Sequence, residues 1–451
     1  MERADAIIIG SGQGGVPLAV NLARAGKSVV LFEKGSFGGS CVNYGCIPSK
    51  AFLASAYIAG IGHEAQGLGI KVQVEVDFLT VMERTRGVAG STSNRLKERV
   101  EKAGVRLIHA EASFTGERTV TGGDITVESP LIVINTGKSP FIPLIPGLEA
   151  TPCLNYINFW DMREMPQRML VIGGGYIGVE LGQGMARLGS KTHIIEKMDR
   201  IIAFEEPDVS QVLTEELEKD GIQFHLGVEV THARYASGVF TITLSNNQEL
   251  EGEALLLAIG QRPNTVELNA QAAGIELDER GNVKVDSHFR TTAPGVYAIG
   301  DVTGQPAFTH VSWEDFRRLM AILEGKDRTQ GDRVLGYAFF TEPEVGRAGL
   351  TLEQARNKGF NARAVTLPLE SVQRARLTGR THGFYRMVVD KDTDRILGAT
   401  LVGPTSAELI HVFVDLMEAG ATWQLLEQAV HIHPTFAEGL PSLARLLTRE
   451  R

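Results

Sequence analysis

The chain is poor in cysteine and in long apolar runs. It has only three cysteines among 451 residues, too few for the disulfide framework of a small secreted domain. No apolar run reaches the roughly 20 residues that a membrane-spanning helix needs. Residues 1–5 lead directly into a strand-like apolar run, Ala6–Ile9, which leaves no room for a secretory leader. We therefore expect a cytoplasmic protein with no membrane partner.

Positive charge is also in short supply. Lysine and arginine number 45 against 54 acidic residues, a formal net charge of −9. Because an acidic surface binds nucleic acid poorly, we expect no nucleic-acid partner. Hydrophobic residues make up 43% of the chain and charged residues 22%, which is ordinary for a folded globular protein. The length allows two or three domains with their own cores.

One pattern of strand, glycine turn, helix and strand occurs twice. In the first copy, Ala6–Ile9 leads to Gly10, Gly12 and Gly15, then to a helical pattern and an apolar run that ends at Glu33. In the second copy, a similar apolar run precedes three glycines and a second acid. These glycines and the acid are Gly173, Gly175, Gly178 and Glu196.

Each copy carries the full dinucleotide-binding pattern rather than an isolated glycine turn. The glycines permit a tight turn and a close backbone approach, and the pyrophosphate lies at the N-terminus of the helix, where free N–H groups attract negative charge. Glu33 and Glu196 would accept hydrogen bonds from ribose hydroxyls. The alternative, two plain glycine turns in an α/β protein, does not account for the matching acids. Two bound dinucleotides are therefore expected.

Three more apolar runs end in glycine, at Gly137, Gly260 and Gly300. The third has no glycine turn of its own, so we expect it to complete the first sheet, with the second copy inserted. This predicts an α/β protein with two Rossmann-like dinucleotide-binding domains. After about residue 330, short strand-like runs surround helical patterns, which predicts a separate α+β domain. The expected bounds are 1–147 with 266–328, 148–265 for the insertion, and 329–451.

Two of the cysteines, Cys41 and Cys46, lie close together behind the first copy. The spacing does not suit zinc, and no further Cys or His pair completes a site, so we expect no metal. Five residues of regular helix rise about 7.5 Å, more than the roughly 4.4–6.8 Å between the Cα atoms of a disulfide. If the two sulfurs form a disulfide, the helix between Cys41 and Cys46 should therefore be distorted, and Gly45 can relieve the strain.

A helix N-terminus at the cysteines would lower a thiol pKa, and Lys50, one turn after Cys46, would add positive charge. The alternative is a pair of unreactive structural thiols. Cys153 stands alone, and we expect it to be a buried structural thiol.

A histidine–carboxylate pair, His433 and Glu438, lies near the C-terminus. Histidine carries protons near neutral pH, and a carboxylate orients its ring and raises its basicity. A thiol that enters or leaves a mixed disulfide needs such a proton carrier. Taken alone, the pair suits a surface contact better than a catalytic dyad, and we interpret His431 as structural.

With these residues in view, the chain resembles the class I pyridine nucleotide–disulfide oxidoreductases, which include dihydrolipoamide dehydrogenase, glutathione reductase and mercuric reductase. The motifs that carry the resemblance are GGSCVNYGCIPSK, GGGYIGVE, YAIGD and HPTFAE. They are spread over essentially the whole chain. The resemblance implies FAD on the first unit, NAD(P)H on the second and a C-terminal domain that forms a homodimer.

The resemblance also assigns residues to the two cofactor sites. A helix starting near Thr309–Val311 would point N–H groups at the flavin carbonyl that becomes negative on reduction. At the FAD site the implied residues are Gly10, Gly12, Gly15, Glu33, Lys50, Thr136, Gly137, Asp301 and His310. At the nicotinamide nucleotide site they are Gly173, Gly175, Gly178, Glu196 and Gly260.

The implied catalytic set consists of Cys41, Cys46, Lys50, Glu180, His433 and Glu438. By the resemblance, Cys46 would be the thiolate that touches the flavin, and Cys41 would meet the acceptor. Lys50 would pair with Glu180 beside the flavin. The histidine and its carboxylate would act across the dimer interface on the cysteines of the other subunit.

Within the family, several stretches resemble mercuric reductase, namely 13–19, 367–375 and 437–440. Residues 304–310 resemble a mercuric-reductase-like group linked to reactive chlorine and copper defence. Two departures from mercuric reductase are expected, because the tail lacks its cysteine pair and we expect no metal-capture domain before Met1. The chain also has His433, as in the lipoamide and glutathione enzymes. We expect a mercuric-reductase-like enzyme that reduces a small-molecule disulfide or a metal ion.

Other functions stay open at this point. The first alternative is dihydrolipoamide dehydrogenase, which oxidises a dithiol with NAD. A further alternative is a flavin-dependent redox sensor or NADH oxidase, and a structural dinucleotide-binding scaffold is the interpretation without catalysis. Glu196 favours NADH because a carboxylate repels a 2′-phosphate, and Lys197 and Arg200 nearby weaken this preference, so we expect NADH, with NADPH as the alternative.

Overall fold

The computed structural model describes residues 1–331 and 333–449. In it the first glycine turn, together with the helix that follows, connects two neighbouring strands of a five-stranded parallel sheet. The central strands are buried along their whole length, as expected for a parallel sheet covered on both faces. In spatial order the strands are β18 (Val296–Ala298), β8 (Ile132–Ile134), β2 (Ala6–Ile9), β3 (Val29–Glu33) and β4 (Arg106–His109).

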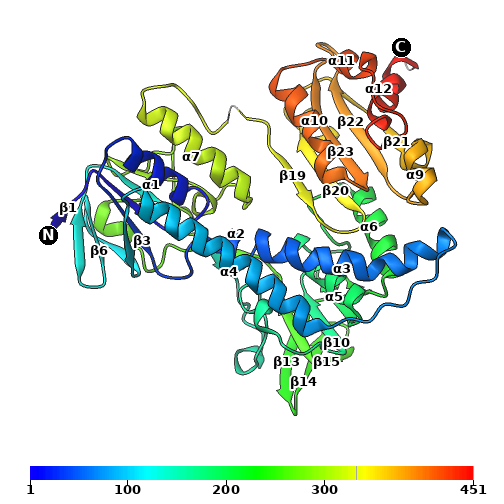
Figure 1. The fold of residues 1–451 in the computed structure, drawn as a ribbon, viewed down its shortest axis with the longest axis horizontal. Helices are drawn as coiled ribbons and strands as arrows, with labels where there is room; N and C mark the ends of the chain where they lie inside the picture. The colour runs from blue at the N-terminus through cyan, green and yellow to red at the C-terminus, as the bar shows by residue number, and fades with distance from the viewer. Residues whose placement is uncertain (332, 450–451) are drawn as a thin grey trace.

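Helices cover one face of this sheet and a second sheet covers the other (Figure 1). The helices are α1 (Gly15–Arg24), α4 (Phe78–Lys102) and α7 (Thr309–Leu323). The second sheet contains β1 (Glu2–Arg3), β7 (Ile125–Glu128), β6 (Thr119–Gly122) and β5 (Ala112–Gly116), beside the short helix η3 (Ala270–Ala273).

Strand β18 confirms that the second unit is an insertion into the first. It follows the second unit in sequence yet pairs in parallel with β8, so that Val296 lies opposite Ile132. The two crossings between the units also lie side by side, because β9 (Lys138–Pro140) and β17 (Gln261–Pro263) form an antiparallel pair. The domain bounds given above stay predictions.

The second unit repeats the parallel arrangement with four strands. Helix α5 packs on one face of its sheet, and a three-stranded antiparallel meander packs on the other. The parallel strands are β12 (Gln223–Leu226), β11 (Lys191–Glu196), β10 (Arg168–Ile172) and β16 (Ala254–Leu257). The helices are α5 (Tyr176–Leu188) and α6 (Pro207–Lys219), and the meander contains β13 (Val230–Ala236), β14 (Val239–Leu244) and β15 (Glu249–Gly252).

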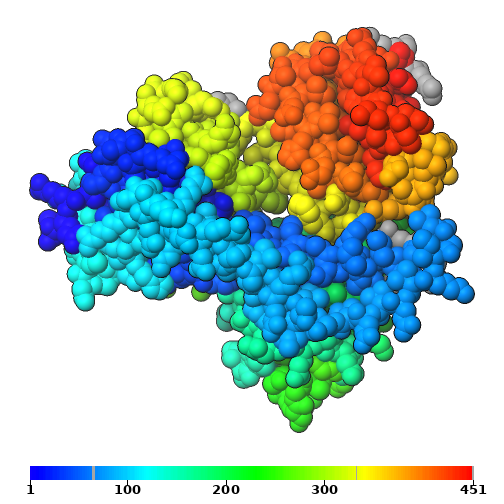
Figure 2. Space-filling view, in the orientation of Figure 1, coloured from blue at the N-terminus to red at the C-terminus, as the bar shows by residue number. Residues whose placement is uncertain are grey.

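The C-terminal domain is the expected α+β unit, an antiparallel sheet with helices packed against it. The strands in spatial order are β19 (Gly336–Phe339), β20 (Glu344–Gly349), β23 (Ile396–Gly403), β22 (Phe384–Asp390) and β21 (Ala362–Pro368). The helices are α8 (Leu352–Asn357), η5 (Leu369–Ser371), α9 (Gln373–Thr378), α10 (Ser406–Glu418), α11 (Trp423–Gln428) and α12 (Gly439–Arg449). In Figure 2 a notch separates this domain, in orange and red, from the yellow residues of α7.

A helical layer joins the three units. The long helix α3 (Cys46–Gly67) packs against α4 and against α5 of the second unit, and Figure 1 shows it passing below the C-terminal domain. The remaining short helices are α2 (Gly39–Asn43), η1 (Leu148–Ala150), η2 (Phe159–Asp161) and η4 (Asp301–Thr303). Among the described residues, no helix combines the length and apolarity needed to cross a bilayer.

Candidate active site

A cavity of about 1020 Å³ opens where the three units meet. The first glycine turn, the cysteine segment and the ends of β8 and β18 line one part of it, and the second unit contributes Tyr176 and Glu180. Of the residues assigned from the sequence, the cavity is lined by Gly10, Gly12, Glu33, Cys41, Cys46, Lys50, Thr136, Gly137, Glu180, Asp301 and His310.

The glycines of the first turn are required by close backbone packing. A Cβ atom on Gly10, whose φ is +103°, would lie 2.3 Å from the carbonyl oxygen of Asn135. One on Gly12 would lie 2.7 Å from the side chain of the same asparagine, and one on Gly15 would lie 2.2 Å from the carbonyl oxygen of Gly10. The turn therefore brings bare backbone to the cavity at the start of α1.

The second turn repeats this packing with one difference. A Cβ atom on Gly173 would lie 2.5 Å from the carbonyl oxygen of Ala258, and one on Gly178 would lie 2.0 Å from that of Gly173. Gly175, at the N-cap of α5, has nothing within 4 Å of such an atom. The middle glycine of the second turn therefore faces open space. Gly260, also expected here, follows β16, and its carbonyl accepts a hydrogen bond from the amide of Phe141 at 3.0 Å.

The two acids also occupy equivalent positions. Glu33 accepts a hydrogen bond from the amide of Ser11 at 2.9 Å, and Glu196 accepts one from the amide of Gly174 at 2.7 Å. Ser11 and Gly174 each follow the first glycine of their turn. Each acid also accepts the amide two residues beyond itself, at 2.7 and 2.9 Å. Both carboxylates are thus fixed at the turn, and their bonds to ribose hydroxyls stay a prediction.

Asn135, which the motifs did not identify, ties the first turn to the sheet. It is 6% exposed. Its Oδ1 accepts a hydrogen bond from the amide of Gly15 at 2.8 Å, and its Nδ2 donates one to the carbonyl of Ile299 at 2.9 Å. One side chain therefore links β8, the start of α1 and the end of β18. The only sequence signal was a polar residue at the end of an apolar run.

The polar groups along the cavity fit a dinucleotide. The hydroxyl of Thr136 is buried and has no hydrogen-bond partner among the described residues. Gly137 next to it has a φ of +66°. Burial raises the pKa of Asp301 to about 6, against the opposing charge of Lys138. A glycine cradle, an unpaired hydroxyl and a buried carboxylate in one elongated cavity suit the phosphates and hydroxyls of FAD.

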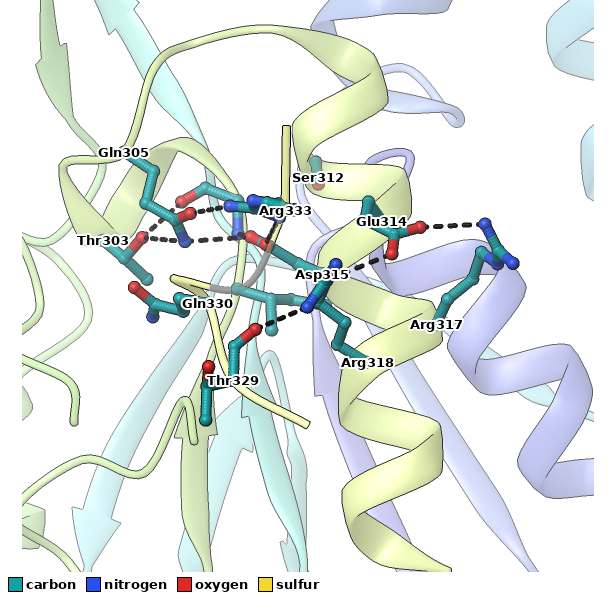
Figure 3. A network of polar contacts seen from close by, with 12 residues as sticks. Thr303, Gln305, Ser312, Glu314, Asp315, Arg317, Arg318, Thr329, Gln330 and Arg333 are labelled. Atoms are coloured by element: carbon teal, nitrogen blue, oxygen red, sulfur yellow. Dashed lines mark hydrogen bonds and ion pairs between the residues drawn. The ribbon is translucent and has the colours of Figure 1, made fainter. Parts of the chain in front are cut away.

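A buried ion pair holds the turn before Asp301 (Figure 3). Asp315, which is fully buried, accepts the amide of Gly300 at 2.9 Å and the Nη1 of Arg333 at 2.7 Å. Burial raises the pKa of Asp315, and the charge of Arg333 opposes that rise. Arg333 also donates to Gln305. The segment that leads to the C-terminal domain is thereby tied to α7 and to the turn before Asp301.

The cysteines lie on either side of a break in the helix, as expected. Cys41 is in the short helix α2, and Cys46 begins α3 after Tyr44 and Gly45. The amide of Gly45 donates to the carbonyl of Ser40 at 2.6 Å, and a Cβ atom on it would lie 3.4 Å from the Cα atom of Cys41. Both sulfurs are free thiols. Cys153, expected to be buried, is half-buried beside the core of the second unit.

The two thiols differ in acidity. A hydrogen bond from Cys41 is the main reason that the pKa of Cys46 falls to about 6. The hydroxyl of Thr309 lies 2.8 Å from the Cys46 sulfur, and this contact and the charge of Lys50 lower the pKa further, against the effect of burial. The same hydrogen bond, together with burial, raises the pKa of Cys41. These shifts favour the thiolate at Cys46 and the protonated thiol at Cys41.

The predicted ion pair between Lys50 and Glu180 is present. Their Nζ and Oε2 atoms are 2.8 Å apart, and Glu180 is 4% exposed. The other oxygen of Glu180 accepts the amide of Phe340 at 2.9 Å, and the ring centroid of Phe340 lies 4.3 Å from the Lys50 nitrogen. The pair thus joins α3, α5 and the C-terminal domain beside the cavity.

Helix α7 begins at Thr309, where the sequence placed it. Nε2 of His310 lies 2.6 Å from the carbonyl oxygen of Gly336, and burial lowers the pKa of His310. Because a carbonyl oxygen only accepts, Nε2 of His310 donates this hydrogen bond. The first N–H groups of α7 lie at the cavity, close to Cys46.

His433 and Glu438 form their pair away from the cysteines of the same chain. Nδ1 of His433 and Oε2 of Glu438 are 2.7 Å apart. The side chain of His433 is 70% exposed, and neither residue is among those that line the cavity. Action on the cysteines of a second subunit stays a prediction.

Comparisons with known proteins agree with the site. The family model described as "Pyridine nucleotide-disulphide oxidoreductase" matches residues 4–315, and the model of the family's dimerisation domain matches residues 336–444. Similar proteins include "Probable pyridine nucleotide-disulfide oxidoreductase RclA" of Escherichia coli, 33% identical over 99% of this chain and 100% of the relative. A dihydrolipoyl dehydrogenase of Halobacterium salinarum is 32% identical, covering 96% of this chain and 94% of the relative.

A mercuric reductase of Staphylococcus aureus is 30% identical over 97% of this chain and 81% of that protein. Among solved structures, the HOCl-induced flavoprotein disulfide reductase RclA from Escherichia coli matches with a TM-score of 0.90. That match has 32% identity and covers 98% of this chain and 100% of the other. The fold and the family inferred from the motifs are thereby confirmed. The chain belongs to the pyridine nucleotide-disulphide oxidoreductases, flavoproteins that use FAD with NAD(P)H, and it carries their dimerisation domain.

Proposed function

We propose that this enzyme reduces a small-molecule disulfide or a metal ion at the expense of NAD(P)H, through FAD and the Cys41–Cys46 pair. The observation that carries the proposal is a pair of free thiols in the cavity, of which Cys46 lies 2.8 Å from the hydroxyl of Thr309 and near the charge of Lys50. Bound FAD would supply two electrons from the nicotinamide to the disulfide. The enzyme would work as a homodimer in the cytoplasm, where NAD(P)H is supplied.

The residues of the chain account for the sulfur chemistry. When two electrons enter the disulfide, the S–S bond breaks, Cys46 leaves as a thiolate and Cys41 takes a proton. Thr309 and Lys50 stabilise the negative sulfur. The remaining thiol, Cys41, is then the group that reacts with an acceptor.

Reduction of a disulfide acceptor produces two thiols, so protons must be transferred. The Cys46 thiolate has no proton to give. The sulfur of Cys41 attacks the acceptor and gives up its proton, the acceptor disulfide breaks, and its first sulfur leaves as a thiol. Attack by the Cys46 thiolate on Cys41 re-forms the enzyme disulfide, and the second sulfur leaves and takes up a proton drawn from solvent. We assign the proton transfers to the His433–Glu438 pair of the other subunit, because a histidine held by a carboxylate is suited to this role.

Counting thiols tests this proposal directly. Anaerobic addition of NADH or NADPH to the oxidised holoenzyme should create two thiols that iodoacetamide alkylates, located at Cys41 and Cys46 by mass spectrometry. No new thiols, or nicotinamide oxidation that survives Cys41→Ser with every acceptor, would abandon the cysteine route in favour of an oxidase or sensor. We propose NADH as the better donor because Glu196 occupies the turn that would face a 2′-phosphate.

Assays with a panel of acceptors should identify the substrate that the enzyme reduces. Relatives include a mercuric reductase, and a solved structure of RclA is described as a Cu(II) complex, so Hg(II) and Cu(II) belong beside glutathione disulfide and lipoamide. A second candidate function, dihydrolipoamide dehydrogenase, is favoured by the His433–Glu438 pair and by 32% identity to such an enzyme. Turnover of free dihydrolipoamide with NAD at rates above those of every acceptor in the panel would favour this second function.

A further inference from the structure

The break between the two cysteines leaves one carbonyl without a partner along the helix. The carbonyl of Tyr44 would be paired, in a continuous helix, with the amide four residues later. That residue is Pro48, which has no N–H. The missing donor comes from the connector between the nucleotide units, where Nε1 of Trp160 lies 2.9 Å from the Tyr44 carbonyl oxygen.

The indole is well placed to hold this carbonyl. Trp160 is 4% exposed, and its N–H is shared with the carbonyl of Tyr156 at 3.0 Å. Its ring centroid lies 4.9 Å from that of Phe159 and 6.0 Å from that of Phe52 in α3, both in edge-on geometry. Nη1 of Arg86 in α4 donates to the backbone carbonyl of Trp160 at 2.6 Å. The indole of Trp160 is therefore held in place by aromatic packing and by a hydrogen bond to its backbone.

The same connector also contacts the residue before Cys41. The hydroxyl of Tyr156, which lines the cavity, donates a hydrogen bond to the carbonyl of Lys138 at 3.3 Å, with the side chain of Ser40 close enough to lower its pKa. Trp160 supplies the hydrogen bond to the chain between Cys41 and Cys46. This bond connects the cysteine segment to the residues that precede β10.

We propose that Trp160 is a positioning residue that sets the dithiol–disulfide equilibrium of Cys41 and Cys46, an inference that rests on the proposed function. In the dithiol, the fixed Tyr44 carbonyl keeps the two sulfurs next to each other, so closing the S–S bond costs little conformational entropy. Without the indole N–H, the chain between Cys41 and Cys46 gains conformational freedom when the S–S bond opens, and the Tyr44 carbonyl lacks its hydrogen-bond donor. Reduction of the disulfide then becomes more favourable.

The experiment is a redox titration of the holoenzyme with dithiothreitol, whose two thiols are oxidised to its cyclic disulfide as the Cys41–Cys46 pair takes up two electrons and one proton, the second proton going to solvent. In Trp160→Phe the equilibrium constant for reduction should rise about tenfold, which is about 30 mV for a two-electron couple. Site-specific replacement of Trp160 by β-(3-benzothienyl)alanine keeps the ring shape but has no N–H. It should give the same shift even if the phenylalanine variant folds poorly.

The matched control is Phe159→Leu, which disturbs the same aromatic cluster without touching the Tyr44 carbonyl. It should lower the melting temperature and leave the equilibrium constant unchanged. A wild-type equilibrium in the benzothienyl variant, or an equal shift in Phe159→Leu, overturns the role of the N–H. If the wild-type protein itself gains no thiols at positions 41 and 46, the proposed function fails instead, so the two failures are distinguishable.

Discussion

The sulfur of Cys46 lies 2.8 Å from the hydroxyl oxygen of Thr309, so the first residue of α7 contacts the first residue of α3. The two residues are far apart in sequence and come together only because β18 closes the first sheet and delivers α7 to the cavity. A hydroxyl at this distance can donate a hydrogen bond to a thiolate but gains less from a neutral thiol. The contact therefore favours the charged form of Cys46.

Removal of this donor should raise the pKa of Cys46. A hydrogen bond to a charged group contributes about 1.5–3 kcal/mol, so Thr309→Val should raise the pKa by about one unit or more, and Thr309→Ser should restore it. The measurement is the rate of alkylation of Cys46 by iodoacetamide against pH. In the wild type the rate should be constant above the pKa of about 6 and fall about tenfold for each pH unit below it. An unchanged midpoint in Thr309→Val would contradict the assigned hydrogen bond.

The two turn glycines of the second unit should respond differently to alanine. A methyl group on Gly175 would meet no other atom within 4 Å, and the backbone there is extended, so Gly175→Ala should keep the wild-type melting temperature. If the pyrophosphate of the nicotinamide nucleotide approaches this backbone, the same methyl group should weaken NADH binding at least about tenfold. Gly178→Ala should instead lose stability, because its Cβ atom would lie 2.0 Å from a backbone oxygen. Wild-type affinity for NADH in Gly175→Ala would place the pyrophosphate elsewhere.

The pair of Lys50 and Glu180 should contribute measurably to stability. Lys50→Met leaves a carboxylate that is 4% exposed without its cation, although the amide of Phe340 still donates to it. Because the lysine side chain is 35% exposed, water offsets part of the loss, and we expect about 1–3 kcal/mol in urea unfolding. The control is Lys102→Met, which removes an exposed pair with Glu98 and should cost about 0.5 kcal/mol or less. Equal effects of the two substitutions would contradict this ranking.

Features that depend on local sequence were predictable. The strand, glycine turn and acid of each nucleotide unit are contiguous, and the structure extends their repeat to the hydrogen bonds of Glu33 and Glu196. The interruption of helix between Cys41 and Cys46 followed from helical rise against disulfide geometry. The insertion of the second unit followed from a third apolar run that lacked its own turn.

Contacts between distant segments were not predictable from spacing. The side chains of Asn135, Trp160 and Thr309 were given no role from the sequence, and each acts on a backbone or sulfur atom brought near by the tertiary fold. The meander β13–β15 and the long helices α3 and α4 also escaped notice. The apolar positions of the meander face the parallel sheet of its own unit, and α3 packs against α4 and α5, so their role is clear only once these elements are packed.

The last prediction concerns His433, whose side chain is 70% exposed and lies outside the cavity of its own chain. His433→Ala should slow turnover with a disulfide acceptor by about 10²–10⁴-fold, the usual range for loss of general acid–base catalysis. Reduction of the cysteines by NADH should be unaffected, since that step involves Cys46 and not the acceptor. Equal slowing of both steps would contradict the assigned role.

Hybrid dimers decide whether the histidine acts across the interface. A dimer of one His433→Ala subunit and one Cys41→Ser subunit contains one complete site only if His433 of each subunit serves the cysteines of the other. Co-expression with two affinity tags should then yield hybrids with about half of the wild-type activity, although each parent homodimer is inactive. If His433 served its own subunit, neither site of the hybrid would be complete and the hybrid would be as inactive as its parents.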